Sequence, residues 1–231
     1  MKKQETKDES MLRMVMEKSL LKQDVSEITK DVFITIQSVL KKIQATLNSS
    51  LHLKEKQLPI GYYEKGDLEA ELRVPGDSVI FIRHTDVFTF HRSHHIWNLS
   101  YVQRDESRSY CGMIYIYNFL SDSIKFKREN DLGYLVGRIF INNERHFFVE
   151  GQRQLGFLYN DFATAIIDNA SIESVVKSAI IHCLDFELFA PAFEQVKIIS
   201  VKQVLQSSSL RKIATGKRLG FRFRADDDEV A

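Results

Sequence analysis

The sequence predicts an α+β fold, in which a mostly antiparallel sheet is packed by helices and preceded by an N-terminal helical segment. Residues 10–50 contain neither glycine nor proline and carry an apolar stripe at helical spacing. From residue 58 onward, glycine and proline recur between runs of β-branched and aromatic residues, as in strands joined by turns. A helical pattern follows these strands. The order of elements along the chain therefore lacks the regular strand–helix alternation of a parallel nucleotide-binding sheet.

The composition is that of a globular chain of 231 residues, with 44% hydrophobic and 27% charged residues. Its 32 basic and 31 acidic residues nearly cancel, so any nucleic acid or anionic membrane would have to be held by a local patch. No apolar run approaches the roughly 18 to 20 residues that cross a bilayer, and the N-terminus has no signal-peptide pattern. We therefore expect a cytoplasmic protein without a membrane partner, with Cys111 and Cys183 as buried thiols.

The N-terminal segment shows the clearest helical stripe. Its apolar positions recur every three or four residues: Val25, Ile28, Val32, Ile36, Val39, Ile43 and Leu47. Asp24 precedes the stripe and is the expected N-cap, which makes residues 12–21 a separate short helix. The stripe either docks onto the body of its own chain or pairs as an arm with a second subunit. About three heptad-like repeats are marginal for a coiled coil.

Strands are expected in the middle of the chain. Residues 78–90 predict either one long bent strand or a hairpin that turns near His84 and Thr85. Residues 110–120 are apolar on both alternating faces and predict a central strand covered on both sides.

Residues 133–151 predict a hairpin. Asn142 and Asn143 tolerate the positive φ angles of a two-residue turn. With the turn there, Ile139 would face His146 and Gly137 would face Phe148.

The C-terminal third predicts a helix that begins at Ser171 as its N-cap. Its broad apolar face would consist of Ile172, Val175, Val176, Ala179, Ile180, Cys183 and Leu184. Pro191 ends this region, and residues 196–205 predict one more strand. These patterns divide the chain into an N-terminal helical arm (1–57), an α+β core (58–205) and a charged C-terminal tail (206–231).

Histidines gather between residues 91 and 95, where His91, His94 and His95 would share one face of a helix. Zinc accepts such ligands, and a carboxylate among them. The preceding residues predict a strand, however, along which the first and last imidazoles would lie about 13 Å apart. The cluster is therefore either a divalent metal site or a polar loop at the end of a strand. A third alternative is a ligand site formed by Phe90, Trp97 and Tyr101.

His146 and Glu150 point to one side of the predicted hairpin strand, where a carboxylate could bind a cation or act as a general base. A nuclease pattern would place a lysine two residues after this glutamate, but position 152 is glutamine. The chain has no GxSxG, SxxK, GxxxxGK[ST] or GxGxxG motif, which disfavours common hydrolases and dinucleotide enzymes.

The tail alternates basic and aromatic residues before four consecutive acids. Its candidate nucleic-acid contacts are Arg211, Lys212, Lys217, Arg218, Arg222 and Arg224. The alternative is a solvated edge strand, protected from edge pairing by its charges. The acids would repel phosphates, so nucleic acid is not the favoured partner.

The leading hypothesis is a non-enzymatic binding or assembly protein that contacts another protein, or a second copy, through residues 10–50. The first alternative is a metal-dependent hydrolase, acting on nucleic acid or on another substrate, that uses His91, His94, His95, His146 and Glu150. The second is nucleic-acid binding through the basic tail. The sequence identifies no cofactor.

Overall fold

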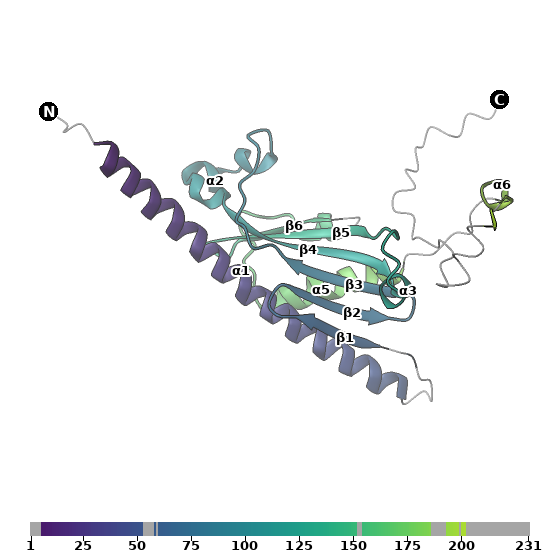
Figure 1. The fold of residues 1–231 in the computed structure, drawn as a ribbon. Coiled ribbons are helices and arrows are strands. Elements are labelled where there is room, and N and C mark those ends of the chain that lie inside the picture. Colours follow the sequence, from purple (N-terminus) through teal and green to yellow (C-terminus); the bar gives the residue numbers. More distant parts are fainter. Residues whose placement is uncertain are drawn as a thin grey trace, which may run out of the picture.

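The computed structural model describes residues 6–52, 58, 60–151, 154–185, 193–198 and 200–201. It confirms the α+β prediction, because a long N-terminal helix and a second helix pack on a six-stranded antiparallel sheet (Figure 1).

Helix α1 (Lys7–His52) is one continuous helix of 46 residues. A reciprocal cap starts it: Thr6 Oγ1 accepts from the Glu9 backbone N–H at 3.2 Å, and Glu9 Oε2 accepts from the Thr6 N–H at 2.9 Å. The predicted break at Asp24, with a separate helix over residues 12–21, is wrong. Nothing in that stretch interrupts the backbone hydrogen bonds, so Asp24 lies within the helix.

The sheet is a meander in which each strand pairs with the next along the chain. Its strands are β1 (Gly61–Lys65), β2 (Glu69–Val74), β3 (Asp77–Arg83), β4 (Cys111–Leu120), β5 (Tyr134–Asn142) and β6 (Phe147–Gly151). Gly66 and Gly76 have φ angles of 60° and 90° in the first two turns, a conformation that glycine adopts without strain.

The segment that follows β3 leaves the sheet. Residues 84–110, here called the cap, contain the short helices η1 (His95–Asn98), α2 (Ser100–Arg104) and η2 (Glu106–Ser109). The prediction for residues 78–90 is wrong in both forms, because the strand ends at Arg83 and no hairpin follows. The chain returns to the sheet through an isolated antiparallel bridge between Phe88 and Cys111.

The predicted hairpin is present as β5 and β6, but its register differs from the prediction. Ile139 pairs with Val149 and Gly137 with Gly151, not with His146 and Phe148. The turn is longer because Arg145, with a φ of 63°, takes the left-handed position that the prediction assigned to asparagine. Asn142 instead closes the loop, its Oδ1 accepting from the backbone N–H of His146 at 2.9 Å.

One face of the sheet carries the main core, where α1 and α5 (Asn169–Leu184) pack side by side. Strand β4 contributes Ile114 and Ile116 to this face. On the opposite face, the cap covers Met113, whereas Tyr115 and Tyr117 are only partly buried. The prediction that this strand is central is confirmed, but it is covered on both sides only near its beginning.

Helix α5 begins one turn earlier than predicted. Asp168 is its N-cap, and Ser171 is the third helical residue of a capping box. All the predicted apolar positions of this helix are buried except Leu184, which is 49% exposed.

The remaining described helices are short: α3 (Ser121–Lys125), α4 (Gln154–Leu158) and α6 (Phe193–Val196). Val196 ends α6 and residues 197–198 are not in a strand, so the strand predicted from residue 196 does not begin there. Residues 199 and 202–205 lie outside the described part. Cys111 and Cys183 are buried and neither is in a disulfide, as expected. Within the described residues, no helix combines the length and apolar character needed to cross a membrane.

Candidate functional site

His94 and Glu150 are the two predicted metal ligands that the fold brings into contact. His94 Nδ1 accepts from the Ile96 backbone N–H at 3.4 Å, so the proton on Nε2 points to Glu150 Oε1, 3.2 Å away. The other carboxylate oxygen of Glu150 binds the guanidinium of Arg138. This carboxylate therefore already has a cationic partner, and the contact ties the cap to β5 and β6.

His95 lies beside this contact, with its ring centroid 4.4 Å from that of His94. Burial lowers the pKa of His95, which favours its neutral form. His91 turns away and hydrogen-bonds Ser93, with 2.9 Å between Nδ1 and Oγ.

His146 stands at a different place, where its Nδ1 donates to the Phe162 carbonyl oxygen at 3.0 Å. Among the residues that the structure describes, no three His, Cys, Asp or Glu side chains are grouped so that they could hold a metal ion together. Of the five predicted ligands, His94 and Glu150 therefore form a pair and His95 lies beside it. The other two, His91 and His146, have different partners.

Phe90 and Trp97, two of the predicted ligand-binding aromatics, lie in the cap and pack against one apolar cluster. Phe90 packs against Phe140 and Phe148, at centroid distances of 5.0 and 5.7 Å. The Trp97 indole N–H donates to the His91 carbonyl oxygen at 3.1 Å, and the Arg92 guanidinium lies 3.9 Å from the indole centroid. Phe90 therefore packs the cap on the sheet, whereas the two Trp97 contacts lie within the cap.

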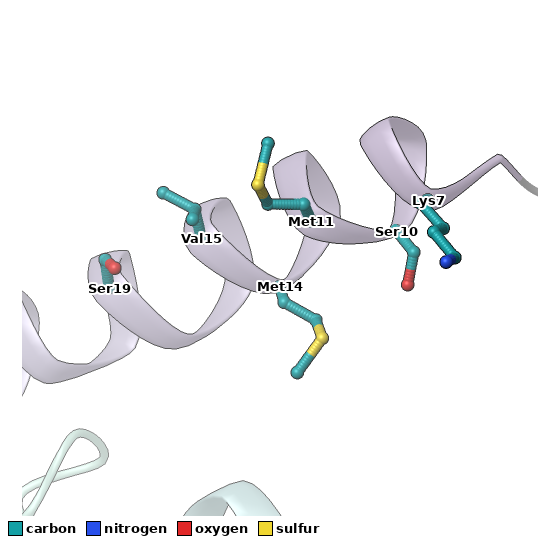
Figure 2. Close-up of a pocket in the computed structure, with 6 residues that line it drawn as sticks. All are labelled: Lys7, Ser10, Met11, Met14, Val15 and Ser19. Carbon is teal, nitrogen blue, oxygen red and sulfur yellow. The ribbon is translucent and has the colours of Figure 1, made fainter.

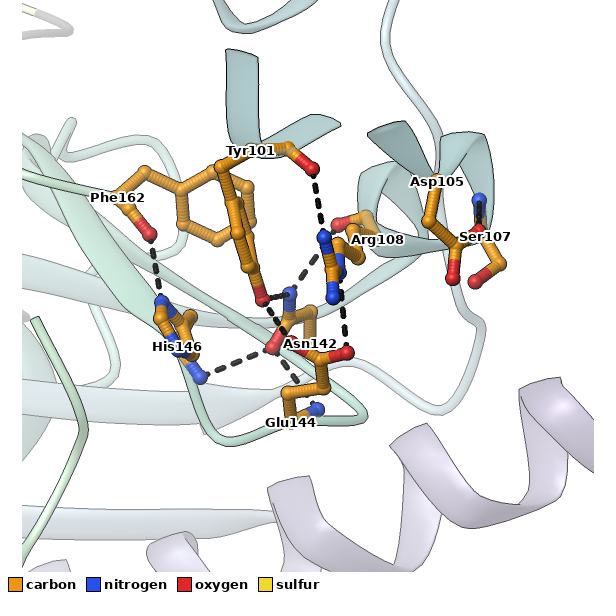
Figure 3. Close-up of polar contacts among 8 residues, drawn as sticks. All are labelled: Tyr101, Asp105, Ser107, Arg108, Asn142, Glu144, His146 and Phe162. Atoms are coloured by element: carbon orange, nitrogen blue, oxygen red, sulfur yellow. Dashed lines mark hydrogen bonds and ion pairs between the residues drawn. The ribbon is translucent and has the colours of Figure 1, made fainter. Parts of the chain in front are cut away.

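Tyr101, the third of these aromatics, joins the cap to the β5–β6 turn through the polar network in Figure 3. Its hydroxyl donates to Glu144 at 2.7 Å and accepts from Asn142 Nδ2 at 2.9 Å, while its ring stacks on His146 at 4.4 Å. Burial raises the pKa of Tyr101, and the hydrogen bond from Tyr101 lowers the pKa of Glu144. The tyrosine is therefore neutral and the glutamate ionised at neutral pH, as a stable structural link requires.

Asn142 lies at the centre of this network and is fully buried. Its amide N–H groups reach Tyr101 and Arg108, and its oxygen accepts from two backbone N–H groups of the turn. Replacing it with alanine is expected to lower the free energy of unfolding by about 3 kcal/mol, because several buried groups lose their partners. Urea unfolding followed by circular dichroism measures the loss, and a value within about 0.5 kcal/mol of zero would contradict this reading of the network.

The predicted nucleic-acid contacts, from Arg211 to Arg224, lie outside the described residues. The described residues therefore do not test the prediction that this segment binds nucleic acid.

The projecting beginning of α1 is the candidate functional element that the structure adds. Residues 7–24, here called the arm, precede Val25, the first buried residue of the helix. In Figure 1 this part of α1 extends past the edge of the sheet toward the N-terminus. At 1.5 Å per residue, the arm is about 27 Å long.

The arm carries large apolar side chains that are exposed to solvent, with Met11 62% and Leu12 60% exposed. The others are Met14, Val15, Met16 and Leu20. Figure 2 shows a shallow hollow along the arm, lined by Lys7, Ser10, Met11, Met14, Val15 and Ser19. Met11 and Val15 project from one side of the helix there and Met14 from another.

The apolar residues of the arm form two faces at 3.6 residues per turn. Leu12, Met16 and Leu20 recur every four residues along one face, and Met11, Met14 and Val15 lie around the other side of the helix. Arg13 and Glu17 form an ion pair of 3.5 Å on the remaining polar side. Four basic residues (Lys7, Arg13, Lys18, Lys22) balance four acidic ones (Asp8, Glu9, Glu17, Asp24), so the arm has no net charge.

The sequence interpretation placed an interaction element in residues 10–50 but did not separate the exposed arm from the buried remainder. The available signal was the T-x-x-E pattern at Thr6 and Glu9, which marks a helix start and so extends the helix through the arm.

Comparisons with protein-family models, with curated proteins and with solved structures find no significant match to this chain.

Proposed function

We propose that this chain is a non-enzymatic binding or assembly protein that associates with another protein through the arm. The supporting observation is the set of large apolar side chains exposed together on one projecting helix. A contiguous apolar patch that is exposed on a protein surface marks an interaction site.

The free energy gained by burying these side chains favours association. Complete burial of a side chain such as leucine or methionine contributes roughly 1.5–3 kcal/mol, so covering several half-exposed ones offsets a large part of the cost of binding. The arm is also held in its helical form by the rest of α1, which packs in the core through Val32, Phe33 and Ile36. A partner therefore binds a helix that is already ordered, which reduces the entropy cost.

The proposed location is the cytoplasm. Two buried cysteines that form no disulfide fit a reducing compartment, where disulfides are rare. The balanced charge of the arm gives it no electrostatic attraction for an anionic membrane or for nucleic acid, which favours a protein as the partner.

Site-specific photo-crosslinking in the cells that make the protein tests this proposal. Benzoylphenylalanine at Met11 or Leu12 is expected to form adducts with a protein, because these side chains would lie in the interface. Mass spectrometry identifies the adducts, and binding is then measured between the purified components.

Two positions on the same helix serve as controls. Glu17 lies on the polar side of the arm, and Ile34 is 44% exposed on the part of α1 that packs on the sheet. Adduct yields at Met11 and Leu12 no higher than at these positions would contradict the proposal.

A further inference from the structure

We infer that the partner of the arm is the arm of a second copy of this chain, packed antiparallel about a two-fold axis at Met16. Residue i of one copy then lies opposite residue 32 − i of the other. This inference rests on the proposed function and specifies the partner.

The apolar face of Leu12, Met16 and Leu20 is symmetric about its middle residue. In the antiparallel pair, Met16 meets Met16 of the second copy and Leu12 meets Leu20. Both copies thus use one patch, as a two-fold dimer interface requires. Glu9 lies opposite Gln23 at each end of the seam, a pairing without charge repulsion.

The length of the arm selects the same register. The helix begins at Lys7 and its first buried residue is Val25, and these two positions lie opposite each other in this register. The arms therefore overlap over their whole length of about 27 Å, and each ends where the body of the other copy begins.

The charges beside the seam also favour the antiparallel orientation. Arg13 and Glu17 of the second copy lie on one flank, offset by two residues or about 3 Å along the axis. Asp8 and Lys22 of the second copy lie on the other flank with the same offset. A parallel pair would instead place one flank against the other and would not bring Arg13 beside Glu17 of the second copy.

Disulfide trapping tests the register. Met16→Cys should form a covalent dimer under mild oxidation, because the two copies of position 16 meet at the axis. Leu12→Cys should not form a dimer with itself, but should link to Leu20→Cys when the two variants are mixed. Both native cysteines are buried and give little background. Self-linking of Leu12→Cys as strong as that of Met16→Cys, or no link at Met16, would overturn the pairing.

Light scattering on the purified full chain tests the association itself. The wild type is expected to be dimeric. Met16→Glu should weaken the dimer by about 100-fold or more, because it places two carboxylates against each other at the axis. Met16 is 53% exposed, so the circular dichroism spectrum of the Met16→Glu variant should keep the helical content of the wild type. Ile34→Glu, at an exposed position outside the arm, is the matched control and should remain dimeric.

The outcomes separate this inference from the proposed function. A monomeric wild type whose photo-crosslinks lead to a different protein would overturn the self-pairing and leave the binding function in place. Absence of both dimer and crosslinks would overturn both. Sedimentation of the monomer with phosphatidylcholine vesicles, abolished by Met16→Glu, would make the occupant a lipid surface and would also overturn both.

Discussion

Replacing Phe33 with alanine is expected to lower the free energy of unfolding by about 3–5 kcal/mol. Phe33 lies on α1, is fully buried and belongs to the core cluster that α1 shares with the sheet. Its removal both forfeits the burial of an aromatic ring and leaves a cavity between helix and sheet. Urea unfolding followed by tryptophan fluorescence and circular dichroism measures the change.

Ile34 provides the matched control for Phe33, because it is the next residue on the same helix and is 44% exposed. Ile34→Ala is expected to cost less than about 1 kcal/mol. Equal effects at the two positions would show that α1 does not pack on the sheet with this face. A large loss of unfolding free energy for the Phe33 variant alone would establish that the second half of α1 belongs to the core. The arm is then the part of the helix that projects beyond it.

Gly112→Ala is expected to cost about 2–3 kcal/mol, because α1 crosses β4 closely at this point. A Cβ added at Gly112 would lie 1.9 Å from Thr29 Oγ1 and 2.8 Å from Thr29 Cβ. Thr29 is itself 1% exposed and donates its hydroxyl to the Val25 carbonyl oxygen, so it cannot turn away freely. The helix must therefore shift away from the strand.

A double-mutant cycle with Thr29→Ala tests this contact. The Thr29 hydroxyl is the atom nearest to the added methyl group, so the double variant should lose less stability than the sum of the single variants. Additive effects in urea unfolding would contradict the close crossing of α1 over β4.

The fold class could be predicted because its signals are local. Strands and helices differ in the spacing of their apolar residues, and the buried positions of α5 were predicted correctly except for Leu184. Element ends were less predictable, because alternative caps compete within a few residues. Asp168 and Ser171 both suit the N-cap of α5, and only the three-dimensional contacts show that they act together.

The hairpin register depended on the backbone conformation of one residue. Two adjacent asparagines favoured a two-residue turn, but Arg145 adopts the left-handed conformation and lengthens the loop. Arginine has no preference for that conformation, so no local signal marked it. The shift changed which residues face each other across the whole hairpin.

The histidine cluster shows why a candidate site is harder to predict than a strand. His94 hydrogen-bonds Glu150, and Tyr101 hydrogen-bonds Glu144, although more than 40 residues of sequence separate the two partners in each case. A single sequence carries no signal that shows which of its distant residues are in contact. The arm raises the converse difficulty, since Leu12 and Val32 are both apolar residues on one helix and only the fold shows which of them is covered.

The order of the strands has a consequence for how the chain folds during synthesis. Every strand pairs with its neighbour in sequence, so the meander can grow one strand at a time. The helix pair is different, because α1 precedes the sheet in the sequence and α5, which contacts it through the ion pair of Lys42 with Glu173, follows the sheet. The apolar stripe of α1 can therefore be covered only after the strands have been made, and α5 completes this core after all six of them.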